Sequence, residues 1–231
     1  MNIEIFTGKA EAYAKARPGY PDAAIDYINS LVLPNAVFAD VGVGTGKFTV
    51  LLARRGYDVF AVEPNADMQE QLAITLAPYP NAKIVDGLAE ATTLPDHSVD
   101  IITCAQSLGW FNLNAFRTEC HRIGKLDIIV ISIYNDIPGD NNIPNNKRLT
   151  CKQATSIFFK NPSVREFPNP IFYTWDRWLQ CMTSISDNPQ PSDSGYESHI
   201  AEMNAIFDRE SVDGFLRRDF VTKVYSERIG L

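Results

Sequence analysis

Over residues 36–134, short continuous apolar runs alternate with segments in which apolar residues recur every three or four positions. Short apolar runs predict strands at Val37–Val41, Asp58–Val62, Ala82–Val85, Val99–Ala105 and Asp127–Tyr134. Between these runs, apolar residues recur every three or four positions, as they do on one face of a helix. A chain that alternates strands with helices predicts a parallel sheet with helices on both faces.

Capping residues support three helices between these strands. The first follows a glycine-rich loop, and Thr45 is its candidate N-cap. The second begins after Asn65 and ends before Pro78, and the third begins after Asn112 or Asn114. Ligands of such sheets bind beyond the carboxyl ends of the strands, so we expect the site there.

The C-terminal third has a less regular pattern. The composition of residues 136–148 predicts a loop. Val164–Tyr173 is extended but holds two prolines, which indicates an edge strand. Helices are predicted over Trp175–Ile185 and Tyr196–Val212, and a final strand over Phe215–Ile229.

Composition narrows the class of protein. The chain has 231 residues, of which 45% are hydrophobic and 21% charged, and its net charge is −7. These values suit one globular domain and disfavour a nucleic-acid or anionic-membrane partner. The four cysteines are scattered with no C-x-x-C pair, so we expect no metal and a reducing, cytoplasmic location. The first residues do not resemble a signal peptide, and no apolar run is long enough to cross a membrane.

The glycine-rich turn after the first predicted strand carries the strongest chemical signal. Gly42, Gly44 and Gly46 are spaced G-x-G-x-G and follow Asp40, and the second strand ends in Glu63. Glycines allow a ligand to approach the backbone closely. An acid after the second strand can accept both hydroxyls of a ribose. The pattern predicts a nucleoside-binding site.

The spacing distinguishes this turn from other nucleotide loops. The dinucleotide fingerprint is G-x-G-x-x-G, and a phosphate loop needs Ser or Thr after its lysine, where this chain has Phe48 after Lys47. Asp40 would repel a pyrophosphate but could hold a cation. A glycine turn that merely caps a helix is the alternative interpretation, and the two acids argue against it.

At these residues the chain resembles the class I S-adenosylmethionine-dependent methyltransferases, whose first motif is an acid followed by G-x-G-x-G. The resemblance is strongest over residues 6–134. It implies an α/β, Rossmann-like, seven-stranded sheet, mostly parallel with an antiparallel C-terminal edge strand, helices on both faces and a small helical insertion. We expect a single domain over 1–231, with a lid segment at 1–30, a cofactor-binding core at 36–134, a helical insertion and edge strand at 150–212, and a final strand at 213–231.

The resemblance also implies the cofactor, S-adenosyl-L-methionine, and roles for its ligands. Glu63 would bind the ribose, and Met68 would pack on the adenine. Gly87–Pro95 is similar to the family's G-D-A-E-x-L-P stretch, but Leu88 replaces the residue that often bonds the adenine amino group, so backbone groups at Leu88 and Ala89 would recognise the base. The full expected set is Tyr13, Arg17, Asp40, Gly42, Gly44, Gly46, Glu63, Pro64, Met68, Leu88, Ala89 and Gln106.

The N-terminal segment is similar to the leader of a small-molecule branch of these enzymes. Tyr13 and Arg17 lie one helical turn apart, and Arg17 could meet the methionine carboxylate. Tyr20 would then lie over the methyl group. The alternative is a surface helix followed by a rigid turn.

The acceptor pocket is expected after the fourth strand. Relatives commonly carry His-Trp where this chain has Gly109-Trp110, so the natural general base is missing. The Asn/Asp-Pro-Pro-Tyr motif of enzymes that methylate amide or adenine nitrogens is also absent, which favours a small-molecule acceptor over DNA or a protein glutamine. The expected acceptor wall is Tyr20, Trp110, Trp175 and Trp178, with a purely structural aromatic core as the alternative.

These observations predict methyl transfer to a small molecule by alignment of the reactants, with no assigned catalytic residue. The three histidines, His97, His121 and His199, are interpreted as surface or capping residues. Two other functions stay open. One is a protein that binds S-adenosylmethionine without chemistry, and the other is a nucleotide-dependent oxidoreductase. The oligomeric state cannot be inferred from the sequence.

Overall fold

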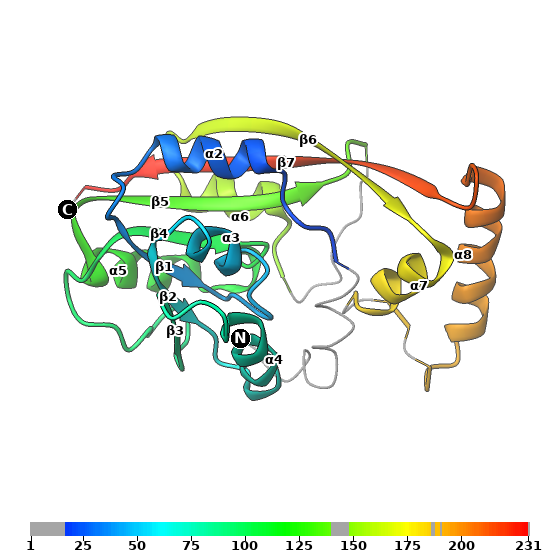
Figure 1. Cartoon of the computed structure of the whole chain (residues 1–231), viewed down its shortest axis with the longest axis horizontal. Coiled ribbons are helices and arrows are strands. Elements are labelled where there is room, and N and C mark those ends of the chain that lie inside the picture. The colour runs from blue at the N-terminus through cyan, green and yellow to red at the C-terminus, as the bar shows by residue number, and fades with distance from the viewer. Residues whose placement is uncertain (1–16, 140–147, 186–187, 190, 231) are drawn as a thin grey trace.

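A seven-stranded sheet forms the centre of the molecule (Figure 1). The computed structural model describes residues 17–139, 148–185, 188–189 and 191–230. The strands are β1 (Val37–Val41), β2 (Asp58–Val62), β3 (Ala82–Val85), β4 (Val99–Ala105), β5 (Gly124–Asp136), β6 (Ser163–Tyr173) and β7 (Leu216–Arg228). Their order across the sheet is β3-β2-β1-β4-β5-β7-β6.

The sheet is mixed, as predicted. Strands β1 to β5 pair in parallel, whereas β7 pairs antiparallel with both β5 and β6. Strand β7 therefore lies inside the sheet, and β6 is one of its two edge strands, with β3 at the other edge. An edge position explains how β6 accommodates Pro168 and Pro170, because one side of the strand needs no ladder partner. The predicted fold class is confirmed.

Helices cover both faces of this sheet. They are α2 (Asp22–Ser30), α3 (Thr49–Ala53), α4 (Ala66–Leu76), α5 (Leu113–Ile123), α6 (Cys151–Phe158), α7 (Trp175–Thr183) and α8 (Tyr196–Glu210), with a short 3₁₀ helix, η2 (Leu108–Trp110). Strand β5 shows the division between the faces. Ile129, Ile131 and Ile133 pack in the cluster that holds α2 and α3, and Ile128 and Val130 pack in the cluster that holds α5 and α6.

Capping chemistry accounts for most helix starts. The Asn65 side chain accepts the N–H of Met68, and the Asn112 side chain accepts the N–H of Ala115, as the sequence predicted. Thr45 is not a cap, because α3 begins only at Thr49. Helices α2 and α6 were not predicted. Helix α2 lies on the sheet with three fully buried side chains, Ala24, Ile25 and Ile28.

Strands β6 and β7 extend from the body of the molecule to α7 and α8 (Figure 1). We call α7, α8 and the ends of β6 and β7 that join them the arm. Its own apolar cluster is centred on Tyr173, Trp178, Cys181, Met203 and Leu216. Within the described residues, no helix has the length and apolar character needed to cross a membrane.

Candidate active site

A cavity of about 980 Å³ lies at the carboxyl ends of the parallel strands, with the arm as its opposite wall. The loops that follow β1, β2 and β4 line it through Gly42–Thr45, Glu63–Asn65 and Ala105–Ser107. Residues from α7, α8 and β7 also line it, as do residues at the end of β5. This is the edge of an open α/β sheet at which ligands bind.

The three glycines of the first loop have different physical roles. All have positive φ, at 69° for Gly42, 56° for Gly44 and 84° for Gly46. A Cβ on Gly42 would lie 2.8 Å from Cβ of Ser107, and a Cβ on Gly46 would lie 2.5 Å from Cδ1 of Leu72. Gly44 has nothing within 4 Å of the same position. Gly42 and Gly46 therefore permit tight packing, and Gly44 leaves open space on the cavity wall.

The Glu63 carboxylate lies in the cavity wall beside this loop. Its side chain accepts the N–H of Gly44 at 2.8 Å and the N–H of Asn65 at 3.0 Å, and the residue is 6% exposed. Burial raises the pKa of Glu63, against the effect of these two hydrogen bonds. Each carboxylate oxygen can accept more than one hydrogen bond, so capacity remains for a ligand.

Asp40 lies below the glycine loop and does not line the cavity. Its carboxylate is fully buried and accepts the hydroxyls of Thr49 at 2.6 Å and Thr103 at 2.8 Å. Burial raises its pKa to about 6, although both hydroxyls favour the charged form. Asp40 thus ties β1 to α3 and β4, which corrects the expectation that it could hold a cation in the site.

The expected methionine end of the site holds several cations. Arg17 lines the cavity and donates to the carbonyl of Ser184 at 3.2 Å, and its own carbonyl accepts Nζ of Lys47 at 2.6 Å. Burial and the neighbouring guanidinium groups of Arg177 and Arg17 lower the pKa of Lys47 to about 8. Tyr13 lies outside the described residues. Arg17 lies where a ligand carboxylate could reach it, and the sequence alone did not indicate Lys47.

Some of the other expected cofactor residues line the cavity, and others do not. Those on the wall are Pro64, Met68 and Gln106. Leu88 and Ala89 are not on the wall. The backbone N–H and carbonyl of Leu88 pair with Ala91 in a tight turn, so the Leu88 N–H is not available to a base. This pairing corrects the expectation for Leu88.

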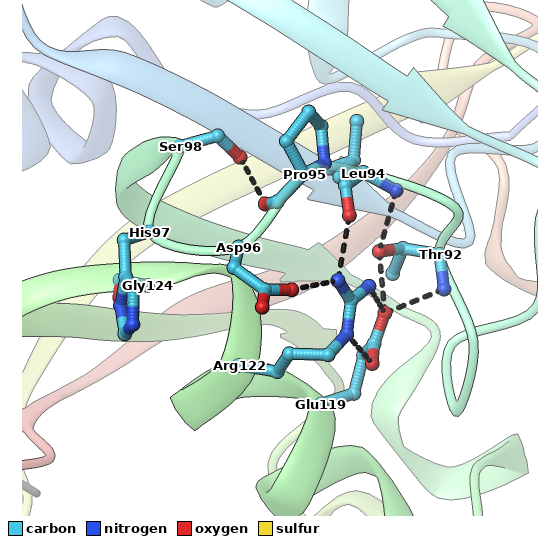
Figure 2. Close-up of polar contacts among 9 residues, drawn as sticks. All are labelled: Thr92, Leu94, Pro95, Asp96, His97, Ser98, Glu119, Arg122 and Gly124. Atoms are coloured by element: carbon cyan, nitrogen blue, oxygen red, sulfur yellow. Dashed lines mark hydrogen bonds and ion pairs between the residues drawn. The ribbon is translucent and has the colours of Figure 1, made fainter.

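A polar network fixes the loop between β3 and β4 on helix α5 (Figure 2). Glu119 accepts the N–H of Thr92 at 2.7 Å and its hydroxyl at 2.6 Å. Arg122 donates to both carboxylate oxygens of Glu119 at 2.6 and 2.8 Å, to the carbonyl of Leu94 at 2.8 Å and to Asp96 at 2.7 Å. Burial would raise the pKa of Glu119, but the hydrogen bonds from Arg122 and Thr92 outweigh burial and lower it. The network holds the loop that resembles the family's adenine-side motif.

The expected acceptor residues are only partly brought together. Tyr20, Trp110 and Trp178 line the cavity. Trp175 does not, and its ring packs against Phe207 at a centroid distance of 5.5 Å. Helix α7 turns this side chain into the core of the arm, which corrects the expectation for Trp175.

Sequence reasoning missed the contribution of helix α8. His199, Glu202, Met203 and Ile206 line the cavity at the i, i+3, i+4, i+7 spacing of one helix face. His199 is therefore a cavity residue rather than a surface or capping histidine. His97 is not on the wall, and its Nδ1 lies 2.9 Å from the carbonyl of Gly124 (Figure 2). The helical spacing of apolar residues in α8 could be read from the sequence. That its polar residues His199 and Glu202 line the cavity could not.

Comparison with known proteins agrees with this geometry. The family model of the methyltransferase domain matches residues 39–131, which span β1 to β5 and include the glycine loop and Glu63. The chain therefore carries a class I methyltransferase domain over these residues, by the family match and by the strand order of its sheet. Among curated proteins, an uncharacterised methyltransferase of Mycobacterium tuberculosis is 40% identical over 107 residues, covering 46% of this chain and 41% of the relative. An uncharacterised methyltransferase-like protein of Schizosaccharomyces pombe is 31% identical over 136 residues, covering 56% and 52%. The chain thus spans about half or less of the length of these relatives.

Solved structures of similar fold cover most of this chain. A structure from Anaeromyxobacter dehalogenans described as a type II methyltransferase has a TM-score of 0.69 at 19% identity, covering 92% of this chain and 97% of the other. The YcgJ protein of Bacillus subtilis has a TM-score of 0.58 at 14% identity, covering 90% and 98%. At these identities the likeness concerns the fold.

Proposed function

We propose that this methyltransferase transfers the methyl group of S-adenosylmethionine to a small organic acceptor. The observation that carries the proposal is the buried Glu63 carboxylate in the cavity wall beside Gly44. A carboxylate there suits the two hydroxyls of a ribose, and the open space at Gly44 lets a ligand approach the backbone.

The residues of this site fit the cofactor. Thr45 lines the cavity, and its buried hydroxyl has no hydrogen-bond partner among the described residues. Met68 offers an apolar surface for the adenine, and Arg17 and Lys47 offer positive charge for a carboxylate. When bound, S-adenosylmethionine supplies a methyl group on a sulfonium whose leaving group is a neutral thioether.

The acceptor would occupy the rest of the cavity. A volume of about 980 Å³ is at the upper end of the range for small-molecule sites, which leaves room for a second ligand beside a nucleoside. Tyr20, Trp110 and Trp178 would surround it. The net charge of −7 disfavours a nucleic-acid acceptor. Alignment of an already nucleophilic acceptor is the main source of catalysis in this proposal.

The test is a methyl-transfer assay on a metabolite extract with S-adenosylmethionine labelled in its methyl group. Label should enter the small-molecule fraction only when the protein is present, and Gly44→Ala should abolish the incorporation. If the label entered protein or nucleic acid, the acceptor class would be wrong. If S-adenosylhomocysteine bound but no label was transferred, a binding protein without chemistry would replace the proposal.

A further inference from the structure

Three polar side chains lie together on a largely apolar face of the sheet. They are Asn135 at the end of β5, Thr222 opposite it on β7, and Asn169 on β6. Ile133 and Val224 form the next ladder pair on this face and belong to the apolar cluster that holds α2. Thr222 is fully buried and Asn169 is 8% exposed. Polar groups at such positions are normally hydrogen-bonded, because an unpaired one costs free energy.

The three side chains bond to one another, and we call Asn135, Asn169 and Thr222 the amide cluster. The Thr222 hydroxyl donates to Oδ1 of Asn135 at 2.6 Å. Nδ2 of Asn169 donates to the Thr222 hydroxyl and to Oδ1 of Asn135, both at 3.2 Å. The hydroxyl is therefore a donor to one amide and an acceptor from the other, and it orients both.

The amide cluster reaches the N-terminal segment at the carbonyl of Gly19. Nδ2 of Asn135 donates to this carbonyl at 2.9 Å, and Nδ2 of Asn169 donates to it at 3.0 Å. A carbonyl oxygen has two lone pairs, so these two bonds use its accepting capacity in full. Gly19 is 116 and 150 residues from the two partners in sequence, so the contact is tertiary rather than local.

Tyr20 follows directly after this carbonyl and lines the cavity. Its ring packs edge-on against Phe48, another cavity residue, at a centroid distance of 5.3 Å. Pro21 restricts the backbone of Tyr20 from the other side, and the carbonyl of Pro21 accepts the N–H of Ala24 in the first turn of α2 at 3.0 Å. The backbone of Tyr20 is thus held between the amide cluster and α2, which sets where its ring enters the cavity.

We propose that the side chains of the amide cluster are positioning residues for methyl transfer, which hold the Gly19 carbonyl so that the Tyr20 ring packs against the acceptor. The assignment rests on the proposed function, in which Tyr20 belongs to the acceptor wall. Catalysis by alignment depends on the position of such a wall to within about 1 Å. The amide cluster acts through Tyr20, and none of its side chains needs to touch the reacting atoms.

The cofactor side of the cavity is held by other contacts. Glu63 is fixed by the N–H groups of Gly44 and Asn65, which lie in the loops after β1 and β2. Loss of the amide cluster should therefore slow methyl transfer and leave the affinity for the cofactor unchanged. A cluster that served only to join β5, β6 and β7 would have a different signature, because its loss would disturb the strands as well as Tyr20.

The first experiment observes Tyr20 through the fluorine resonances of protein labelled with fluorotyrosine and saturated with S-adenosylhomocysteine. The chain has nine tyrosines, and Tyr20→Phe and Tyr27→Phe assign the two resonances needed. Tyr27 reports on the strands, because its hydroxyl lies 3.3 Å from Oγ of Ser163 on β6. Thr222→Val removes the hydroxyl but keeps the shape of the side chain, and Asn169→Ala removes one donor to the carbonyl. Both should shift the Tyr20 resonance and leave that of Tyr27 in place, and Thr222→Ser, which keeps the hydroxyl, should restore the parent spectrum.

The second experiment measures the transfer of labelled methyl groups from S-adenosylmethionine to the small-molecule fraction of a metabolite extract. Thr222→Val and Asn169→Ala should lower the initial rate about 10- to 100-fold, because a displacement of about 1 Å in a site has an effect of this order. Calorimetry should show an unchanged affinity for S-adenosylhomocysteine in both variants. Thr118→Val is the matched control, because the Thr118 hydroxyl bonds to the carbonyl of Asn114 in its own helix at 3.2 Å and Thr118 does not line the cavity. It should keep the parent rate.

Four results would overturn the positioning role. They are an unchanged Tyr20 resonance, a full transfer rate despite a shifted Tyr20 resonance, equal shifts of Tyr20 and Tyr27, and a loss of S-adenosylhomocysteine affinity as large as the loss of rate. If Thr222→Val does not fold, Asn169→Ala gives the same readouts. Absence of transfer by the parent would instead overturn the proposed function and the positioning role with it, while the fluorine spectra would still show whether the amide cluster holds Tyr20.

Discussion

Gly44 and Gly56 both have a backbone conformation that strains an L side chain, but only Gly44 lies at the cavity. Both have positive φ, at 56° and 85°, and both have open space where a Cβ would lie. Only Gly44 lines the cavity. Gly44→Ala and Gly56→Ala should therefore each lower the free energy of unfolding by about 1 kcal/mol, the strain of a left-handed alanine.

Only the Gly44 variant should lose affinity for S-adenosylhomocysteine, because only there would the methyl group occupy the ligand's space. Denaturant unfolding and calorimetric titration of both variants check this pair. Equal affinities in the two variants would show that no ligand approaches Gly44.

Asp40 makes a residue-level prediction about pH. Its pKa is about 6 in the folded protein, against an ordinary value of 3.8, because burial penalises the charge. The folded state therefore holds this proton more tightly than the unfolded state, and the stability from Asp40 falls as pH rises from about 4 to about 6. An asparagine at this position does not titrate, so the difference in stability between the parent and Asp40→Asn should carry this slope.

Urea unfolding across this pH range measures the effect. Asp58→Asn, at the exposed start of β2, is the control and should leave the slope unchanged. Parallel curves for the parent and Asp40→Asn would contradict the assignment of the slope to Asp40.

At the scale of single residues, the sequence predicted which residues lie at the sheet edge better than it predicted what their side chains contact. Glu63 and the glycines could be found because the spacing after two strands fixes their place at the sheet edge. The role of Asp40 could not be predicted, because its partner Thr103 comes from a neighbouring strand 63 residues away in sequence. The place of His199 on the cavity wall likewise depends on how the arm packs.

At the scale of elements, the network between the β3–β4 loop and α5 makes a stability prediction. The Glu119 side chain is 7% exposed and that of Arg122 is 37% exposed. Arg122→Ala would leave the buried carboxylate with Thr92 alone and should lower the free energy of unfolding by about 1–3 kcal/mol. Arg217→Ala removes an exposed pair with Asp219 and should change it by less than about 1 kcal/mol.

The same network has a defined pH dependence. Since the pKa of Glu119 is lowered in the folded state, its stabilisation is present above the unfolded pKa and is lost as pH falls through the folded value. The difference in stability between the parent and Arg122→Ala should therefore shrink on acidification. A difference that is constant with pH, measured by thermal unfolding, would contradict this account.

Comparison of the predicted and observed elements shows which of them can be read from a short stretch of sequence. Strands β1 to β4 have the bounds that the apolar runs indicated. Most residues of β1, β2 and β4 are buried, and buried parallel strands are continuous apolar segments. Helix α6 was missed although Thr150 and Gln153 form a capping box in the structure. That signal was readable in the sequence. Helix α2 was also missed, and its N-cap residue, Pro21, makes no side-chain capping hydrogen bond.

At the scale of the whole molecule, the alternation of strands and helices was enough to predict the sheet. Glu63 and the glycine loop were enough to predict one side of the cavity. On the opposite side, Trp178 was predicted, but the contributions of α8 and β7 were not. This side requires β6 and β7 to extend beyond the body and carry α7 and α8 over the strand ends (Figure 1). That placement depends on tertiary packing in the arm rather than on any local pattern.

The measurement that tests the central claim most directly is a calorimetric titration of S-adenosylhomocysteine into the parent, Glu63→Gln and Asp58→Asn. Loss of the carboxylate should remove roughly 1.5–3 kcal/mol of binding free energy, which is a 10- to 100-fold weaker Kd. Asp58→Asn lies at the far end of the same strand and should bind as the parent does. Equal affinity of Glu63→Gln and the parent, or tighter binding of NAD than of S-adenosylhomocysteine, would contradict the account.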